Sequence, residues 1–137
     1  MSTAYTALLS VRQIEEQQAE VTMAEALRAL SVVRKVVEQV RAAREAWLGE
    51  RLDAGMAETL SSLELAEREA ELRLVEAEQR AAAAREALLE RQRRRKVVEK
   101  LHLAALAAAA RDEARRRQVE LDELGGRSVG AFSERAR

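Results

Sequence analysis

Apolar residues recur at alternating steps of three and four along the first third of the chain. This stripe consists of Met23, Ala26, Leu30, Val33, Val37, Val40, Arg44 and Trp47. Such spacing places the residues on one side of an α-helix and is the heptad seam of a coiled coil. We therefore predict a first helix from about Ala4 to about Leu48.

A second apolar row comes before this stripe and is out of phase with it. The row consists of Leu8, Val11, Ile14 and Val21. A change of phase of this kind indicates that the seam shifts to another side of the helix. We expect the seam to drift or stutter near Gln17.

The later part of the chain has a seam with smaller side chains. Its positions are Leu60, Leu63, Ala70, Leu74, Ala77, Ala81, Ala84 and Leu88, then Arg91 and Arg95, then Val98, Leu101, Ala105 and Ala108. Small side chains at a helix contact allow the facing helix to approach closely. The pattern predicts a second helix that begins between residues 54 and 61 and ends at Leu124.

Glycines mark where these helices stop. The chain has no Pro, and its five Gly form two clusters, one at residues 49 and 55 and one at 125, 126 and 130. Gly costs about 1 kcal/mol inside a helix and Pro about 3. The first cluster predicts a hinge at about 49–57. Residues 1–126 are thus predicted to form an all-α, antiparallel two-helix coiled coil, a helical hairpin, and residues 127–137 a flexible, disordered tail. A parallel homodimer of one continuous helix is the rival, and the hinge glycines argue against it.

Composition agrees with long helices and offers little for catalysis. The chain of 137 residues is 35% charged and only 2% aromatic, which is typical of a coiled coil and not of a globular core. It has no Cys, and its one His, His102, has no converging ligands in the pattern. We find no nucleophile with a base partner and no glycine-rich phosphate loop. We therefore expect a protein that is not an enzyme, with no cofactor and no metal.

Charge is uneven along the chain although the net charge is zero. Residues 91–137 carry 13 basic and 7 acidic side chains, whereas residues 58–90 carry 4 and 9. The basic end predicts a partner surface, and an ordinary solvated helix face is the alternative. The candidate residues are Arg93, Arg94, Arg95, Lys96, Arg115, Arg116 and Arg117.

Nucleic acid and membrane are disfavoured as partners. Acidic residues are interspersed with the arginines, and no aromatic side chain lies among them to stack on bases. No apolar run approaches the length of a membrane span, and the first residues lack a signal-peptide pattern. We expect a cytoplasmic protein without membrane insertion.

The basic end also carries a resemblance to a family. The stretches Arg93–Leu101 (RRRKVVEKL) and Arg115–Leu124 (RRRQVELDEL) resemble the flagellar and type III secretion stalk proteins of the FliJ/YscO kind. The order of parts is similar too: a leucine-rich start followed by Arg12, then Trp47 before the hinge and Met56 after it. Length and architecture match over the whole chain. The Ala-rich segment 104–110 departs from the family, whose members often carry more charge there.

This resemblance implies a non-enzymatic stalk in a protein-export apparatus. Such proteins are antiparallel two-helix coiled coils that insert into the hexameric ring of the export ATPase. Their hinge end contacts the cytoplasmic domain of the export gate, and some bind export chaperones. The resemblance implies a place in the cytoplasm at the periphery of the membrane apparatus. It assigns the basic candidates to the ATPase ring and Val40, Trp47 and Leu60 to the export gate.

Two other functions remain open from the residues alone. One is a generic coiled-coil adaptor or scaffold with an unrelated partner, and the other is a nucleic-acid-binding helical hairpin. Trp47 likewise has two interpretations, because it could seal the hairpin or dock on a partner. The sequence does not choose between a flagellar and a virulence-type export system.

Overall fold

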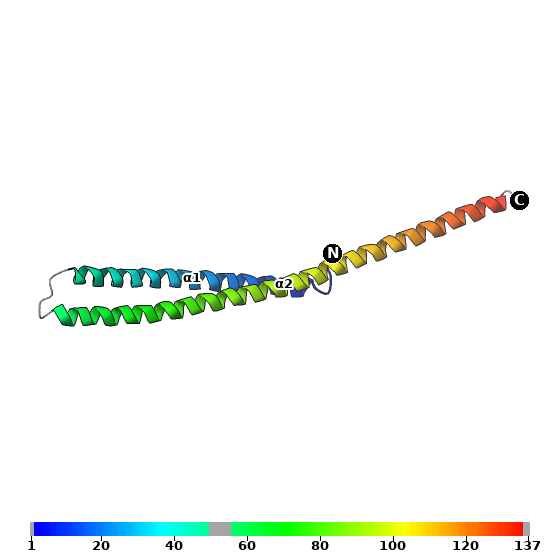
Figure 1. Ribbon diagram of the computed structural model, residues 1–137. Coiled ribbons are helices and arrows are strands. Elements are labelled where there is room, and N and C mark those ends of the chain that lie inside the picture. Colours follow the sequence, from blue (N-terminus) through cyan, green and yellow to red (C-terminus); the bar gives the residue numbers. More distant parts are fainter. Residues whose placement is uncertain (1, 50–55, 136–137) are drawn as a thin grey trace. The chain divides into compact units, whose positions relative to one another are not determined.

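Two α-helices account for nearly all of the part of the chain that the structure describes. The structure is a computed structural model that describes the backbone of residues 2–49 and 56–135 and the side chains of residues 2–49 and 57–127. Helix α1 spans Thr6–Leu48 and helix α2 spans Met56–Arg135 (Figure 1). No strand occurs among these residues. The predicted all-α helical hairpin is confirmed.

The chain divides into two compact units, which we describe separately. One is Gln13–Arg94, and the other joins the residues up to Arg12 with those from Arg95 onward. In the unit Gln13–Arg94, α1 and α2 run side by side in opposite directions (Figure 1). The hinge predicted at 49–57 is described only at its edges. Gly49 donates its backbone N–H to the Glu45 carbonyl at 3.1 Å, α2 begins at Met56, and residues 50–55 lie outside the described part.

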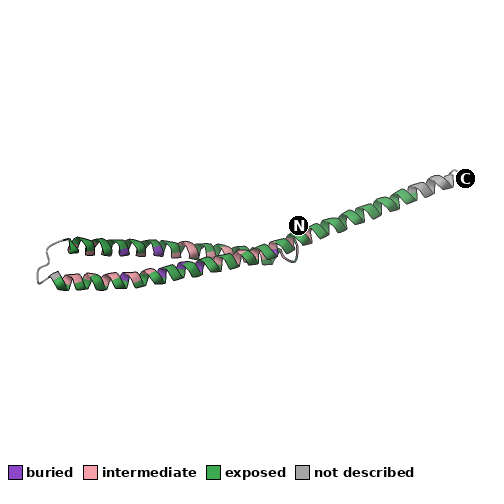
Figure 2. Cartoon of the chain, in the orientation of Figure 1, coloured by how far each residue is buried: buried purple, intermediate pink, exposed green. Residues whose placement is uncertain are grey.

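Large side chains of α1 pack against alanines of α2 in this unit. Leu30 and Val37 are 6% and 2% exposed. Leu30 forms a cluster with Ala77 and Ala81, and Val33 and Leu74 pack against that cluster. The buried residues lie along the facing sides of the two helices (Figure 2). Both predicted stripes therefore face each other, as the heptad spacing indicated.

The predicted stutter near Gln17 is wrong. The row Leu8, Val11, Ile14 and Val21 is 39–57% exposed. Burial instead continues in phase with the main stripe, at steps of three and four. Its half-buried positions before Met23 are Leu9, Arg12, Glu16 and Ala19. The phase of the helix sets which side faces α2, so Arg12 and Glu16 lie at the contact while the apolar row faces solvent.

The second unit joins the residues up to Arg12 with those from Arg95 onward. It contains a short contact between these two parts and then an exposed stretch of α2. Val98 is 6% exposed, and His102, Ala105 and Leu106 are half-buried. The Thr3 hydroxyl lies 2.6 Å from Nδ1 of His102, so His102 is a contact residue that ties down the start of the chain. The predicted seam positions Leu101 and Ala108 are exposed, because the contact follows His102 instead. Every residue from 107 to 127 is exposed (Figure 2).

The predicted end of the second helix at Leu124 is wrong, whereas the flexible tail predicted at 127–137 stays a prediction. Helix α2 continues through Gly125 and Gly126 to Arg135, and residues 136–137 lie outside the described part. Neither glycine has a positive φ, so neither adopts the left-handed conformation of a helix cap. Gly is unfavourable within a helix but does not forbid one, and no Pro follows to end it.

Replacing Gly125 and Gly126 with Ala should strengthen the end of α2. A Cβ built at either position meets no atom within 4 Å, so the change adds no clash. Each substitution should stabilise the local helix by about 0.5–1 kcal/mol, because Ala loses less conformational freedom than Gly. Far-UV circular dichroism should report higher helicity, and the reverse change, Ala114→Gly in the same exposed stretch, should lower it. A loss of helicity in the double Ala variant would mean that the glycines cap the helix.

Candidate interaction surfaces

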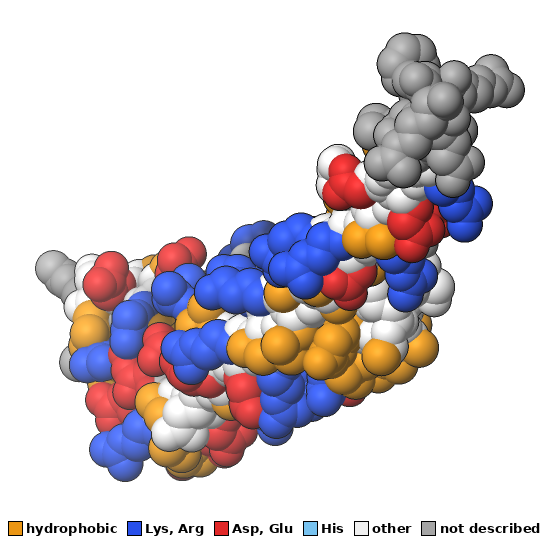
Figure 3. Space-filling view, turned by 90° about the vertical axis from the view of Figure 1, so that its right-hand side faces the viewer, with side chains coloured by type: hydrophobic (Ala, Val, Ile, Leu, Met, Phe, Trp, Pro, Cys, Tyr) orange, Lys and Arg blue, Asp and Glu red, His pale blue; other side chains and the backbone are white. Residues whose placement is uncertain are grey.

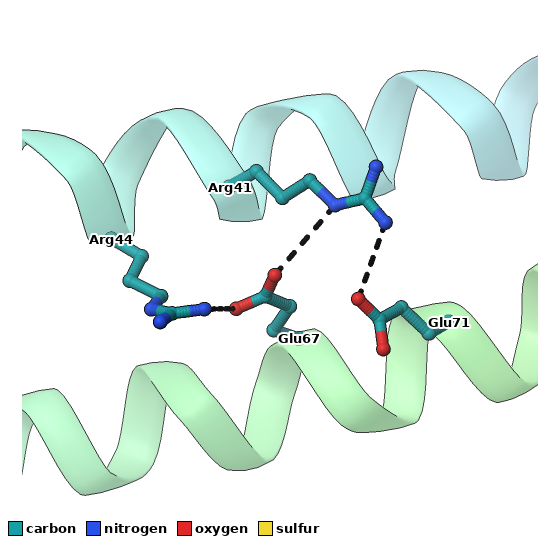
Figure 4. A network of polar contacts seen from close by, with 4 residues as sticks. All are labelled: Arg41, Arg44, Glu67 and Glu71. Atoms are coloured by element: carbon teal, nitrogen blue, oxygen red, sulfur yellow. Dashed lines mark hydrogen bonds and ion pairs between the residues drawn. The ribbon is translucent and has the colours of Figure 1, made fainter.

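A charged network joins α1 to α2 near the hinge. Nη1 of Arg44 lies 2.6 Å from Oε2 of Glu67. Arg41 contacts Glu67 through Nε at 3.6 Å and Glu71 through Nη2 at 3.2 Å (Figure 4). The hydrogen bond and charge of Glu67 raise the pKa of Arg44 above its ordinary value.

Glu67 occupies a seam position that the sequence analysis missed. Its side chain is 12% exposed, against 40% for Arg44. The sequence did contain a sign of this position. The predicted seam goes from Leu63 directly to Ala70, seven residues on, and a continuous heptad seam requires one more residue between them that faces the other helix. We expect an ionic pair between apolar seam positions to favour one alignment of the helices over shifted ones.

The basic run around residue 94 is largely engaged with glutamates. Arg94 pairs with Glu90 at 2.6 Å, and Arg95 pairs with Glu99 on its own helix. Arg95 is half-buried, whereas Arg93, Arg94 and Lys96 are exposed. Of these three exposed residues, only Arg94 is in an ion pair among the described residues.

The second group of predicted partner residues lies on the exposed stretch of α2. Arg115, Arg116 and Arg117 are all exposed, and Arg117 pairs with Glu113 at 2.7 Å. Exposed ion pairs of this kind contribute about 0–1 kcal/mol. They can therefore be exchanged for a partner's acidic groups at little cost.

The same stretch carries an apolar row that the sequence analysis did not identify. The row advances by alternating steps of four and three residues, and Arg117 occupies its one position that is not apolar. Its apolar members are Leu103, Ala107, Ala110, Ala114, Leu121 and Leu124. The three leucines are 56%, 62% and 61% exposed. Figure 3 shows apolar side chains beside basic ones on the surface of the molecule. A long helix gains most of its stability from packing of such a row, so an uncovered row indicates a contact surface.

The three residues assigned to the export gate lie on the facing sides of the hairpin. Val40 and Trp47 of α1 and Leu60 of α2 are all half-buried. They do not form an open apolar patch. Among the described residues, the exposed large apolar side chains nearest the hinge are instead Leu48 and Leu65, at 50% and 58%.

The described residues offer no assembled metal site. Across the described ranges, no group of three or more His, Asp or Glu side chains could hold a metal ion. None of the helices that the structure describes is both long and apolar enough to cross a membrane.

Comparisons with known proteins add no assignment. Protein-family models, curated proteins and solved structures all gave no match to the chain. The family resemblance therefore rests on the residues quoted above.

Proposed function

We propose that this chain is a non-enzymatic stalk or coupling protein of a flagellar or type III export apparatus. In this function the basic part of α2 enters the ring of the hexameric export ATPase. The observation that supports it best is the stretch 107–127, where every residue of a helix is exposed and both an apolar row and three consecutive arginines are available. Long-helix composition and the quoted motifs support the same proposal.

The hinge end is proposed to contact the cytoplasmic domain of the export gate. Val40, Trp47 and Leu60 are half-buried, so their remaining exposed parts and the neighbouring Leu48 would form that contact. Export chaperones are further candidate partners, for which the row from Leu103 to Leu124 is the available surface. The protein would act in the cytoplasm at the periphery of the membrane apparatus.

A generic coiled-coil adaptor is the second candidate. The uncovered row on α2 favours it equally, because that row fits any helical partner with an apolar face. Nucleic acid is less well supported, since acidic residues are interspersed with the arginines and no aromatic side chain lies among them to stack on bases.

Neutralising Arg115, Arg116 and Arg117 together as Gln should weaken binding to the export ATPase about tenfold, on the basis of roughly 0.5 kcal/mol for each exposed charge. The measurement is stimulation of ATP hydrolysis by the purified hexameric ATPase, titrated with the full chain. The matched control changes Arg34, Arg68 and Arg85 to Gln, which removes the same charge from exposed positions elsewhere.

Two results would contradict the proposal. One is that the unaltered chain leaves ATP hydrolysis unchanged, in which case the adaptor becomes the better candidate. Alternatively, a gel shift with DNA or RNA at physiological salt that disappears in the triple variant would favour nucleic-acid binding.

A further inference from the structure

One side of the unit Gln13–Arg94 exposes both apolar and charged residues. Ala29, Arg73, Glu76 and Arg80 surround one hollow of about 230 Å³ between α1 and α2, so all four lie on the same side of the hairpin. Residues at steps of three and four share one side of a helix. Val32 and Val36 therefore share the side of Ala29 on α1, and Glu69 shares that of Arg73 on α2.

The charged row on this side is complementary to a reversed copy of itself. Along α2 the row is Glu69, Arg73, Glu76 and Arg80, with alternating sign. When a second copy runs antiparallel, residue 69 faces residue 80 and residue 73 faces residue 76. Each acid then meets an arginine, which gives four complementary contacts. Within the described residues none of these four side chains has an ion pair.

The apolar row on α1 is centred at the same place. Val33 and Leu74 pack against one core cluster, so the centre of the charged row, between Arg73 and Glu76, lies opposite residues 32–33. A reversed copy about that point places Val32 beside its own equivalent and Ala29 against Val36. Val32 is 60% exposed, Val36 is 38% exposed, and Ala29 is exposed.

We propose that this face is an interface between two copies of the chain. A two-fold axis perpendicular to the helices would place α1 on α1 and α2 on α2 and produce an antiparallel four-helix bundle. Such an interface is isologous, because the same patch serves both copies. The valines supply apolar contact, and the alternating charges select the antiparallel orientation. This proposal is independent of the export ATPase.

Sedimentation velocity of the full chain over a range of concentrations should show a species of twice the mass of one chain. Val32→Glu places a charge at the two-fold axis and should weaken dimer formation by at least about tenfold. The matched control is Val75→Glu. Val75 is 50% exposed. It lies on the same side of α2 as Glu64, Arg68 and Glu71, at steps of three and four, and these three residues line a hollow on the other side of the hairpin. Circular dichroism should show both variants to be as helical as the unaltered chain.

A charge exchange tests the orientation. Arg73→Glu should weaken the dimer because the new acid faces Glu76 of the other copy at both equivalent contacts. The double variant R73E/E76R should restore the dimer because every contact is again complementary. The control Arg85→Glu makes the same charge change at an exposed position outside the row and should have no effect. Since the chain has no Cys, oxidation of a Val32→Cys variant should give an intermolecular disulfide, whereas Val75→Cys should not.

Several results would overturn the proposal. The chain would stay monomeric at every concentration, or the dimer would survive Val32→Glu. The double variant R73E/E76R would dimerise as weakly as Arg73→Glu, or the two Cys variants would form the intermolecular disulfide equally.

Discussion

Replacing Leu30 with Ala is expected to lower the free energy of unfolding by about 3 kcal/mol, near the lower end of the range for buried Leu→Ala changes. Leu30 is 6% exposed and is the large side chain at the centre of the cluster with Ala77 and Ala81. Alanines on the facing helix cannot expand to fill the space that the leucine leaves. The measurement is urea unfolding followed by circular dichroism, at one fixed chain concentration because association changes apparent stability.

The control is Leu27→Ala, the same substitution one turn earlier on α1. Leu27 is 46% exposed, so its replacement should change the free energy of unfolding by less than about 1 kcal/mol. Equal effects of the two variants would mean that Leu30 is not at the helix contact.

The hairpin was predictable because its signal is repeated many times. Each of the eight positions from Met23 to Trp47 is buried or half-buried, since a helix of fixed pitch brings every one of them to the same side. The start of α2 also fell within the predicted range of 54–61.

The phase of weaker segments was not predictable from hydrophobicity alone. Leu8, Val11 and Ile14 are more apolar than Arg12 and Glu16, yet the latter are half-buried. Long polar side chains can pack their methylene groups at a helix contact while their charged ends reach solvent. The seam position of Glu67 was not predicted either, because it depends on the ion pair with Arg44 of the facing helix and not on the hydrophobicity of Glu67 itself.

The candidate surfaces were predicted only in part. The charge imbalance identified Arg115, Arg116 and Arg117, which are exposed. It did not identify the row from Leu103 to Leu124, because many of its members are alanines in an Ala-rich region where several helix sides look alike. The self-complementary face required knowledge of which residues of α1 and α2 share one side of the hairpin.

Trp47→Ala is expected to lower the free energy of unfolding by roughly 2 kcal/mol, less than the 3–5 kcal/mol typical of a fully buried aromatic residue. The indole is half-buried on the side of α1 that faces α2, in the same row as Val40 and Arg44. Its loss removes the only large aromatic contact next to the hinge. Thermal melts of the variant measure the effect, and Trp47→Phe should recover about half of the loss because an aromatic ring again occupies the contact.

Fluorescence separates this structural role from the proposed docking on an export gate, because Trp47 is the single Trp of the chain. A half-buried indole should be quenched by acrylamide to an intermediate extent in the free protein and become more shielded when the gate domain binds. A shielded indole with a large drop in stability and unchanged gate binding would leave only the structural role. A freely quenched indole, with an unchanged melting temperature and weakened gate binding, would instead make Trp47 a docking residue. The half-buried position of Trp47 places the expected outcome between these two, with effects on both stability and binding.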